Sequence, residues 1–95
     1  MPEYPGGMEA FKKFMLRHLR QPDLNAGEKV VVKIQFVVKA DGVINRLKVV
    51  QSGGVLDDEV LRVARKMPKW KPGVQNGQFV AVYFTLPVTF LGPEI

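Results

Sequence analysis

The residue types that carry out covalent catalysis are scarce in this 95-residue chain, which has one histidine, His18, and no cysteine. The only serine is Ser52. Nucleophilic catalysis needs a nucleophile, a general base and a group that orients the base, and these residues cannot supply all three. His18 lies late in a basic amphipathic stretch, where a cation suits the C-terminal end of a helix. We therefore predict that the protein is not an enzyme.

The acidic and glycine clusters have simpler explanations than a metal or phosphate site. Asp57, Asp58 and Glu59 stand at the start of a helical pattern, where negative charge suits the helix dipole. Asp41 belongs to an Asp-Gly turn signal and is not available to form a carboxylate pair with Asp58. The two Gly-Gly pairs lack the spacing and the lysine of a phosphate-binding loop. The sequence predicts no metal and no cofactor.

The elements that must position any site follow from the periodicity of the apolar residues. Spacings of three and four residues predict two amphipathic helices, and β-branched stretches bounded by turn signals predict three strands. The expected elements are a helix over about 6–20, strands over about 29–39 and 43–51, a helix over about 56–67 and a strand over about 78–90. Together they form a single α+β domain over residues 1–95.

The order of the strands can also be predicted. Asp41-Gly42 predicts a two-residue type I′ turn, which makes the first two strands antiparallel neighbours. A right-handed crossover through the second helix makes the third strand parallel to the second. The first strand is the most apolar of the hairpin pair and belongs in the middle. We therefore expect a three-stranded antiparallel/mixed sheet of order two, one, three, with two helices packed on one face.

Pro87 indicates which backbone groups of the third strand are free. Proline has no N–H, so within a sheet it lies on an edge strand with its missing donor turned away from the neighbour. Residues of the same parity as Pro87 should then present free N–H and C=O groups. Such an edge can dock an extended peptide, or pair with a second copy to give a homodimer. The expected binding strand comprises Phe79, Val80, Ala81, Val82, Tyr83, Phe84 and Thr85.

The stretch MPKWKPG, residues 67–73, packs two prolines and a tryptophan before the third strand. Pro68 ends the second helix, and Pro72 followed by glycine suits a turn. Trp70 is expected to fold back over the edge of the core. We predict that this stretch is a corner that delivers the third strand to the sheet edge, and not itself a contact surface.

The net charge of +5 favours acidic partners, such as acidic peptides, anionic surfaces or nucleic acid. Strand parity places Lys33, Arg46 and Lys48 on the sheet face opposite the helices. Sheets that bind single-stranded RNA also need a cluster of aromatic stacking platforms, and this face offers Tyr83 and Phe79 in an element order unlike that of an RNA recognition motif. A basic nucleic-acid-binding domain is therefore the weaker alternative.

Four stretches carry a resemblance to a known family. The motif YPGG and an amphipathic helix precede VVVKIQFVVKADGVINRLKVVQSGG, LDDEVLRVARKMPKWKPGVQNGQ and VAVYFTLPVTF. Together they resemble the C-terminal domain of TonB, in the variety typical of Bacteroidetes energy transducers. The resemblance covers nearly the whole chain.

The resemblance implies a periplasmic domain of a protein that is anchored in the inner membrane and driven by the ExbB–ExbD motor through a part outside this chain. Such a domain couples the proton-motive force to active import by binding the TonB box of outer-membrane TonB-dependent transporters. The box adds as a strand beside the last long strand, which is Phe79 to Leu86 here. A second contact region would lie just before the first strand, at Arg20, Gln21 and Pro22.

Two positions depart from the family pattern, since relatives usually carry tyrosine where this chain has Gln21 and glycine where it has Lys29. The same domain also occurs fused to other membrane proteins, including metallopeptidase-like sensors. The resemblance therefore leaves open whether the parent protein is an energy transducer or a sensor that uses the domain as an interaction module.

Overall fold

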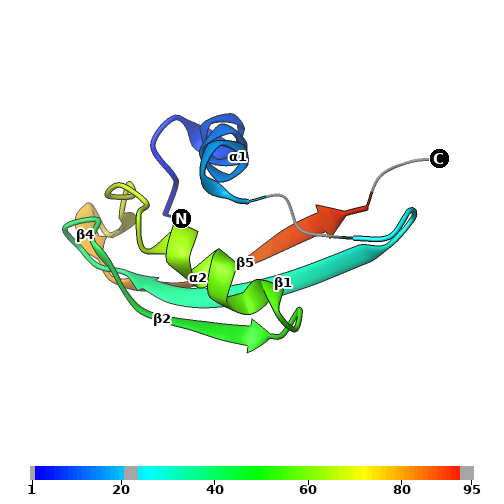
Figure 1. Ribbon diagram of the computed structural model, residues 1–95. Coiled ribbons are helices and arrows are strands. Elements are labelled where there is room, and N and C mark those ends of the chain that lie inside the picture. The colour runs from blue at the N-terminus through cyan, green and yellow to red at the C-terminus, as the bar shows by residue number, and fades with distance from the viewer. Residues whose placement is uncertain (1, 21–23, 93–95) are drawn as a thin grey trace.

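The computed structural model describes residues 2–20 and 24–92, and Figure 1 shows its helices and strands. The elements in chain order are α1 (Gly7–His18), β1 (Lys29–Val38), β2 (Ile44–Gln51), α2 (Leu56–Ala64), β3 (Gly73–Gln75), β4 (Gln78–Val80) and β5 (Val82–Leu91). β1, β2 and β5 form the main sheet, and β3 and β4 form a separate two-stranded hairpin.

The main sheet has the order β2-β1-β5, with β1 antiparallel to both neighbours. β1 and β5 pair without interruption from Lys29 opposite Leu91 to Val38 opposite Val82. The pairing of β1 with β2 is less regular and shifts register twice. The predicted α+β class and the predicted strand order are confirmed.

The core lies between the main sheet and the two helices. Every second residue of β1 from Val32 to Val38 is buried, while the residues between them are partly or fully exposed. Phe11 and Met15 of α1 join the same buried cluster as Val60, Val63 and Ala64 of α2. Because one face of β1 receives apolar side chains from both helices, both helices cover the same face of the sheet.

The turn between β1 and β2 is of a different type from the one predicted. A type I′ turn needs positive φ at both central residues, but only Gly42 (φ 87°) has it here, and Asp41 does not. Lys39 N–H donates to the Val43 carbonyl oxygen at 2.9 Å, and Gly42 N–H donates to the Lys39 carbonyl oxygen at 2.8 Å. This is a three-residue loop in which a type I turn is followed by a left-handed glycine.

The helices are shorter than predicted, and the predicted third strand is two strands. α1 spans Gly7–His18, and α2 ends at Ala64, after which Arg65 and Lys66 form a turn. The predicted strand over 78–90 breaks at Ala81 into β4 and β5. β4 leaves the main sheet because it pairs with β3, a strand that the prediction missed.

Asn76 and Gly77 form the turn of that β3–β4 hairpin. Both have positive φ, 52° and 75°, which is the type I′ geometry that the sequence suggested for the Asp-Gly turn. Val74 lies opposite Phe79 across the hairpin, and both side chains are exposed.

Gly42 has a packing role as well as a conformational one. Its carbonyl oxygen accepts the Trp70 N–H at 2.9 Å, and a Cβ at position 42 would collide with the Trp70 carbonyl oxygen. The Gly42→Ala variant should therefore suffer both left-handed strain and displacement of the 67–73 corner. Gly77→Ala is the matched control, because its φ is also positive but a Cβ there would meet nothing within 4 Å.

We expect Gly77→Ala to lower the free energy of unfolding by about 1–2 kcal/mol, the cost of a left-handed alanine. Gly42→Ala should cost about 1 kcal/mol or more beyond that, because the hydrogen bond to Trp70 is strained or lost. Urea denaturation of both variants measures the difference. Equal losses for the two variants would show that the contact with Trp70 does not constrain position 42.

Candidate partner-binding edge and groove

β5 is an edge strand, and no other described strand covers its outer side. Gly92 N–H donates to the Glu28 carbonyl oxygen at 2.7 Å, one step beyond the pair formed by Lys29 and Leu91. Bonded and non-bonded pairs alternate along an antiparallel ladder, so the even-numbered residues of β5 bond to β1. The odd-numbered residues, including Pro87, direct their backbone groups away from β1. The missing N–H of Pro87 therefore costs the sheet no hydrogen bond, as its sequence position predicted.

The residues of the predicted binding strand fall in different places. Val82, Tyr83, Phe84 and Thr85 lie on β5 and pair with β1. Phe79 and Val80 lie on β4, with Val80 opposite Gly73, and Ala81 joins the two strands. The prediction of one continuous edge beginning at Phe79 was therefore wrong. The free edge of the main sheet begins at Val82 and extends to Leu91, farther toward the C-terminus than predicted.

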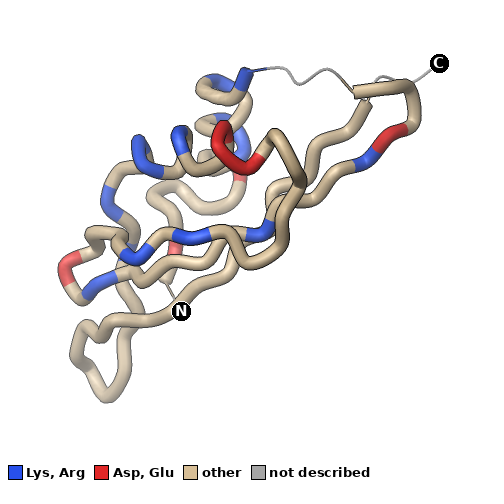
Figure 2. Tube along the Cα trace, turned by 60° about the horizontal axis from the view of Figure 1, so that its bottom comes forward, with Lys and Arg blue, Asp and Glu red and all other residues tan. Residues whose placement is uncertain are grey.

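The open face of the sheet carries exposed polar and basic side chains, among them Lys33 and Lys48. Arg46 is also exposed, but it lies where the register of β1 and β2 shifts and has a positive φ of 53°. Figure 2 shows that Lys and Arg occur both on α1 and along the strands of the sheet. Tyr83 also lies on this face and is 61% exposed, but Phe79 belongs to the separate hairpin. In the described part of the chain, the two aromatic side chains therefore stand on different sheets.

A groove lies between α1 and the C-terminal half of β5. It encloses about 480 Å³, and its lining is mostly apolar. The lining residues from the helix side are Met8, Phe11, Lys12, Met15, Leu16, Leu19 and Arg20, and those from β5 are Pro87, Val88, Thr89, Phe90 and Leu91. Arg20, from the predicted second contact region, thus lies in the same groove as β5. Gln21 and Pro22 lie outside the described residues.

The N-terminal side of α1 is fixed to the core by Tyr4 and Glu3. Tyr4 packs edge-on against Trp70, with ring centroids 5.6 Å apart, and against Phe11 at 5.5 Å. Burial raises the pKa of the Tyr4 phenol above its usual value. The backbone of Glu3 exchanges two hydrogen bonds with Lys71, of 2.9 and 2.7 Å. The approach to the helix therefore docks against the 67–73 corner.

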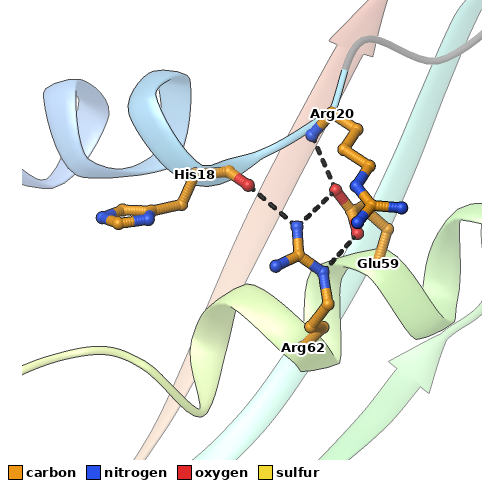
Figure 3. Close-up of polar contacts among 4 residues, drawn as sticks. All are labelled: His18, Arg20, Glu59 and Arg62. Carbon is orange, nitrogen blue, oxygen red and sulfur yellow. Dashed lines mark hydrogen bonds and ion pairs between the residues drawn. The ribbon is translucent and has the colours of Figure 1, made fainter.

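The C-terminal side of α1 is tied to α2 by Glu59 and Arg62, as Figure 3 shows. Arg62 donates two hydrogen bonds to the Glu59 carboxylate, at 2.7 and 2.9 Å, and one to the His18 carbonyl oxygen at 2.9 Å. The Arg20 N–H donates to the same carboxylate at 2.6 Å. Because both ends of α1 are held, the helix keeps a defined position over β5.

Glu59 gives this attachment a pH dependence. The hydrogen bonds from the Arg62 side chain and the Arg20 N–H lower the pKa of Glu59 from 4.5 to about 2. A carboxylate with a lowered folded-state pKa stabilises the fold above its unfolded-state pKa, and this contribution is lost as the pH falls toward the folded-state value. The stabilisation should therefore be complete above about pH 5 and disappear between about pH 4.5 and pH 2.

We expect the Glu59→Gln variant to have a lower Tm than the parent protein at pH 7 and to converge with it as the pH approaches 2. Asp58→Asn is the matched control, since it removes the same charge from the same turn of α2 and its side chain is exposed. Thermal unfolding followed by circular dichroism across pH 2–7 measures both. A constant Tm difference for Glu59→Gln over this range would contradict the role of its carboxylate.

The described residues contain no group of three His, Asp or Glu side chains arranged to hold a metal ion. Within residues 2–20 and 24–92, no helix has the length and apolar character needed to cross a membrane. What these residues offer instead is an unpaired strand edge beside an apolar groove. Such an edge can add a strand from another chain.

A family model described as Gram-negative bacterial TonB protein C-terminal matches residues 24–91. The chain belongs to this family. The matched stretch contains β1 to β5 and α2, which include the whole main sheet and its free edge. No curated protein matches the sequence.

The TonB C-terminal family consists of non-enzymatic periplasmic domains that take part in energy transduction and interact with outer-membrane TonB-dependent receptors. α1 precedes the stretch that the TonB family model matches. The β5 edge is therefore part of the family domain, whereas one wall of the groove comes from outside the matched residues.

Proposed function

We propose that this TonB C-terminal domain binds the TonB box of outer-membrane TonB-dependent transporters by adding the box as a fourth strand along β5. The unpaired β5 edge, with Pro87 in its outward-facing set, carries the proposal. The binding strand is then Val82–Leu91, with Tyr83 and Thr85 among the residues whose backbone groups meet the box. Arg20 contributes from the far side of the groove.

Backbone hydrogen bonds alone should hold the TonB box only weakly. A box of five or six residues adds about four to six hydrogen bonds, each of about 0.5–1.5 kcal/mol net. Ordering the peptide costs about 1–2 kcal/mol per residue, so the two contributions nearly cancel. Side-chain contacts along the edge, and attraction between the basic domain and an acidic box, supply the rest. That electrostatic part should weaken as the salt concentration rises.

The proposal extends to the parent protein. It places the domain in the periplasm as the C-terminal part of a protein anchored in the inner membrane, with ExbB–ExbD acting through the N-terminal part, and it couples the proton-motive force to import. In the alternative, the same domain serves a membrane sensor or peptidase as an interaction module. The reading frame around this chain distinguishes the two, because a single span followed by a proline-rich spacer is expected only for the transducer.

The binding is tested with synthetic peptides that span the TonB box of each TonB-dependent transporter encoded in the same genome. We expect at least one peptide to shift the amide NMR signals of β5 more than those of β2. A second series of peptides carries single N-methyl groups along the backbone. Methylation should abolish binding at every second position, because alternate amides of an added strand face β5. Loss of binding without this two-residue period would overturn strand addition.

Two rival uses of the same edge predict different results. A homodimer through β5 would sediment with a larger mass as the protein concentration rises. A nucleic-acid-binding domain would bind oligonucleotides with a steep salt dependence. We expect neither at the concentrations at which the box peptides bind.

A further inference from the structure

We propose that α1 is the second wall of the peptide site, so that a strand added to β5 inserts every second side chain between β5 and α1. The occupant is an extended peptide with aliphatic side chains at alternate positions and an acidic side chain beside Lys12. This inference rests on the proposed strand addition and deepens it. Backbone pairing alone does not select a peptide sequence, whereas a second wall formed by α1 would select its side chains.

The first observation is that the groove-lining residues of α1 form one continuous face. Their spacing of three and four residues is that of a single helix stripe. Phe11 and Met15 on this stripe are buried in the core, but Met8 is 54% exposed and Leu16 is 78% exposed. Two large, exposed apolar side chains of α1 therefore border a groove that the described chain leaves unfilled.

The second observation is the geometry of strand addition at this edge. The even-numbered residues of β5 point toward the core, since Val88 and Phe90 are buried, and the odd-numbered ones are exposed on the open face. A strand that continues the sheet follows the same alternation, so its residues opposite Val88 and Phe90 also point to the helix side. On that side, next to Val88 and Phe90, lies the groove. The added side chains would cover Leu16 and remove apolar surface from water.

The third observation is the charge of the groove. Among the described residues, the charged side chains that line it are Lys12 and Arg20, and none of the lining residues is acidic. Arg20 lies close to Glu59 (Figure 3), whose pKa it helps to lower. Lys12 forms no ion pair among the described residues. An acidic side chain of the added strand would therefore find a cation available at Lys12.

The fourth observation is that α1 is held at both ends, by Tyr4 against Trp70 and by the hydrogen bond from Arg62 to the His18 carbonyl oxygen. A fixed wall selects side chains, because the peptide has to match a groove whose width is set in advance. α1 also lies outside residues 24–91, which the family model matches. The wall that selects side chains therefore comes from residues outside the matched stretch.

The experiment uses an acetylated peptide, Asp-Thr-Val-Thr-Val-Thr-Val, in which aspartate and the valines point to the same face of an extended strand, and a second peptide with asparagine in place of aspartate. Both are titrated into the protein and followed by NMR. Leu16→Gln should weaken binding of the first peptide about three- to tenfold, since the exposed leucine loses its apolar contact, while Leu16→Met should leave it nearly unchanged. Both variants keep the helix, because Leu16 is exposed and all three residues are good helix formers.

Lys12→Gln and Lys13→Gln form the charge test, because they remove the same charge from neighbouring positions on α1. Lys12 lines the groove, and Lys13 lies on another side of the helix beside Ala10 and Phe14. Lys12→Gln should weaken the aspartate peptide about two- to fivefold and the asparagine peptide hardly at all, whereas Lys13→Gln should affect both peptides equally.

The outcomes separate this inference from the proposed function. If Leu16→Gln and Lys12→Gln bind both peptides as the parent protein does, while N-methylation of the backbone abolishes binding with a two-residue period, strand addition stands and the α1 wall is wrong. If the period is absent, strand addition itself fails. A parent protein that does not bind the aspartate peptide at millimolar concentration would also overturn the α1 wall, because that peptide carries every feature that the groove requires. The α1 wall would also be overturned if the parent protein formed a homodimer that the Leu16→Gln substitution dissociates.

Discussion

Thr85→Pro should weaken the binding of TonB box peptides more than about tenfold while the domain stays folded. Thr85 belongs to the odd-numbered set of β5, so its N–H faces away from β1 and is free to meet an added strand. Proline removes this donor and puts its ring in the path of the incoming backbone. The pair between β1 and β5 loses no hydrogen bond, as Pro87 already demonstrates at an equivalent position.

Thr85→Val is the matched control for this prediction. Both variants lose the hydroxyl group that accepts a 3.4 Å hydrogen bond from the Gln35 side chain, but only the proline variant loses the N–H. Phe84→Pro gives the opposite contrast, because the N–H of Phe84 faces β1 and its removal should destabilise the sheet. Peptide titration and thermal unfolding measure both effects. Equal peptide affinity for the proline and valine variants would exclude pairing at this part of the edge.

The main sheet was predictable from local patterns. Alternation along residues 29–39 identified the buried face of β1, and the Asp-Gly signal placed β2 beside it, even though Asp41 and Gly42 form a longer turn than expected. Pro87 then fixed the orientation of the edge strand, because a residue without an N–H has few tolerated positions in a sheet. In each case one residue or one short stretch determines the outcome by a steric or hydrogen-bonding constraint of its own.

The break at Ala81 was not predictable in the same way. Residues 78–90 have a nearly continuous β-branched and aromatic pattern, which indicates a strand but does not name its partner. β4 pairs with β3 because the Asn76-Gly77 turn brings Gly73 opposite Val80. The signal for that hairpin was present in the turn, but β3 is only three residues long and falls below the length at which alternation can be recognised.

The groove and the attachment of α1 depend on contacts between distant parts of the chain. The spacing of Glu59 and Arg62 suggests an ion pair within α2, but not that both residues also bind the end of α1, where the partners are 39 and 44 positions away. Met8, Lys12 and Leu16 show a stripe at four-residue spacing, but this spacing does not say which side of the stripe packs against the core. Local patterns predicted the amphipathic helix but not the surface that it leaves open.

Trp70→Ala should be the most destabilising single substitution considered for this domain. The Trp70 ring is 3% exposed and packs against Phe36, Phe84 and Tyr4 at centroid distances of 5.2, 5.3 and 5.6 Å. It therefore joins β1, β5 and the approach to α1 in one aromatic cluster. Truncation of such a residue costs about 3–5 kcal/mol, a large part of the stability of a small domain.

Trp70→Phe separates the packing of the ring from its polar atom. The indole N–H has no hydrogen-bond partner among the described residues, so phenylalanine loses ring volume but no hydrogen bond. We expect it to cost less than half as much as alanine. Urea denaturation must be followed by circular dichroism, because Trp70 is the only tryptophan and both variants lose the fluorescence signal.

The alanine variant has a second expected effect, at the peptide site. Tyr4 loses the ring against which it packs, so the N-terminal end of α1 is held less firmly, by the Glu3–Lys71 backbone hydrogen bonds, while Arg62 still holds the other end. Under conditions where Trp70→Ala remains folded, it should bind the alternating aspartate peptide about as weakly as Leu16→Gln does, because a wall that moves no longer selects side chains. If the folded Trp70→Ala variant bound the peptide with the affinity of the parent protein, the corner at 67–73 would have no effect on binding in the groove. The tryptophan would then support the core alone.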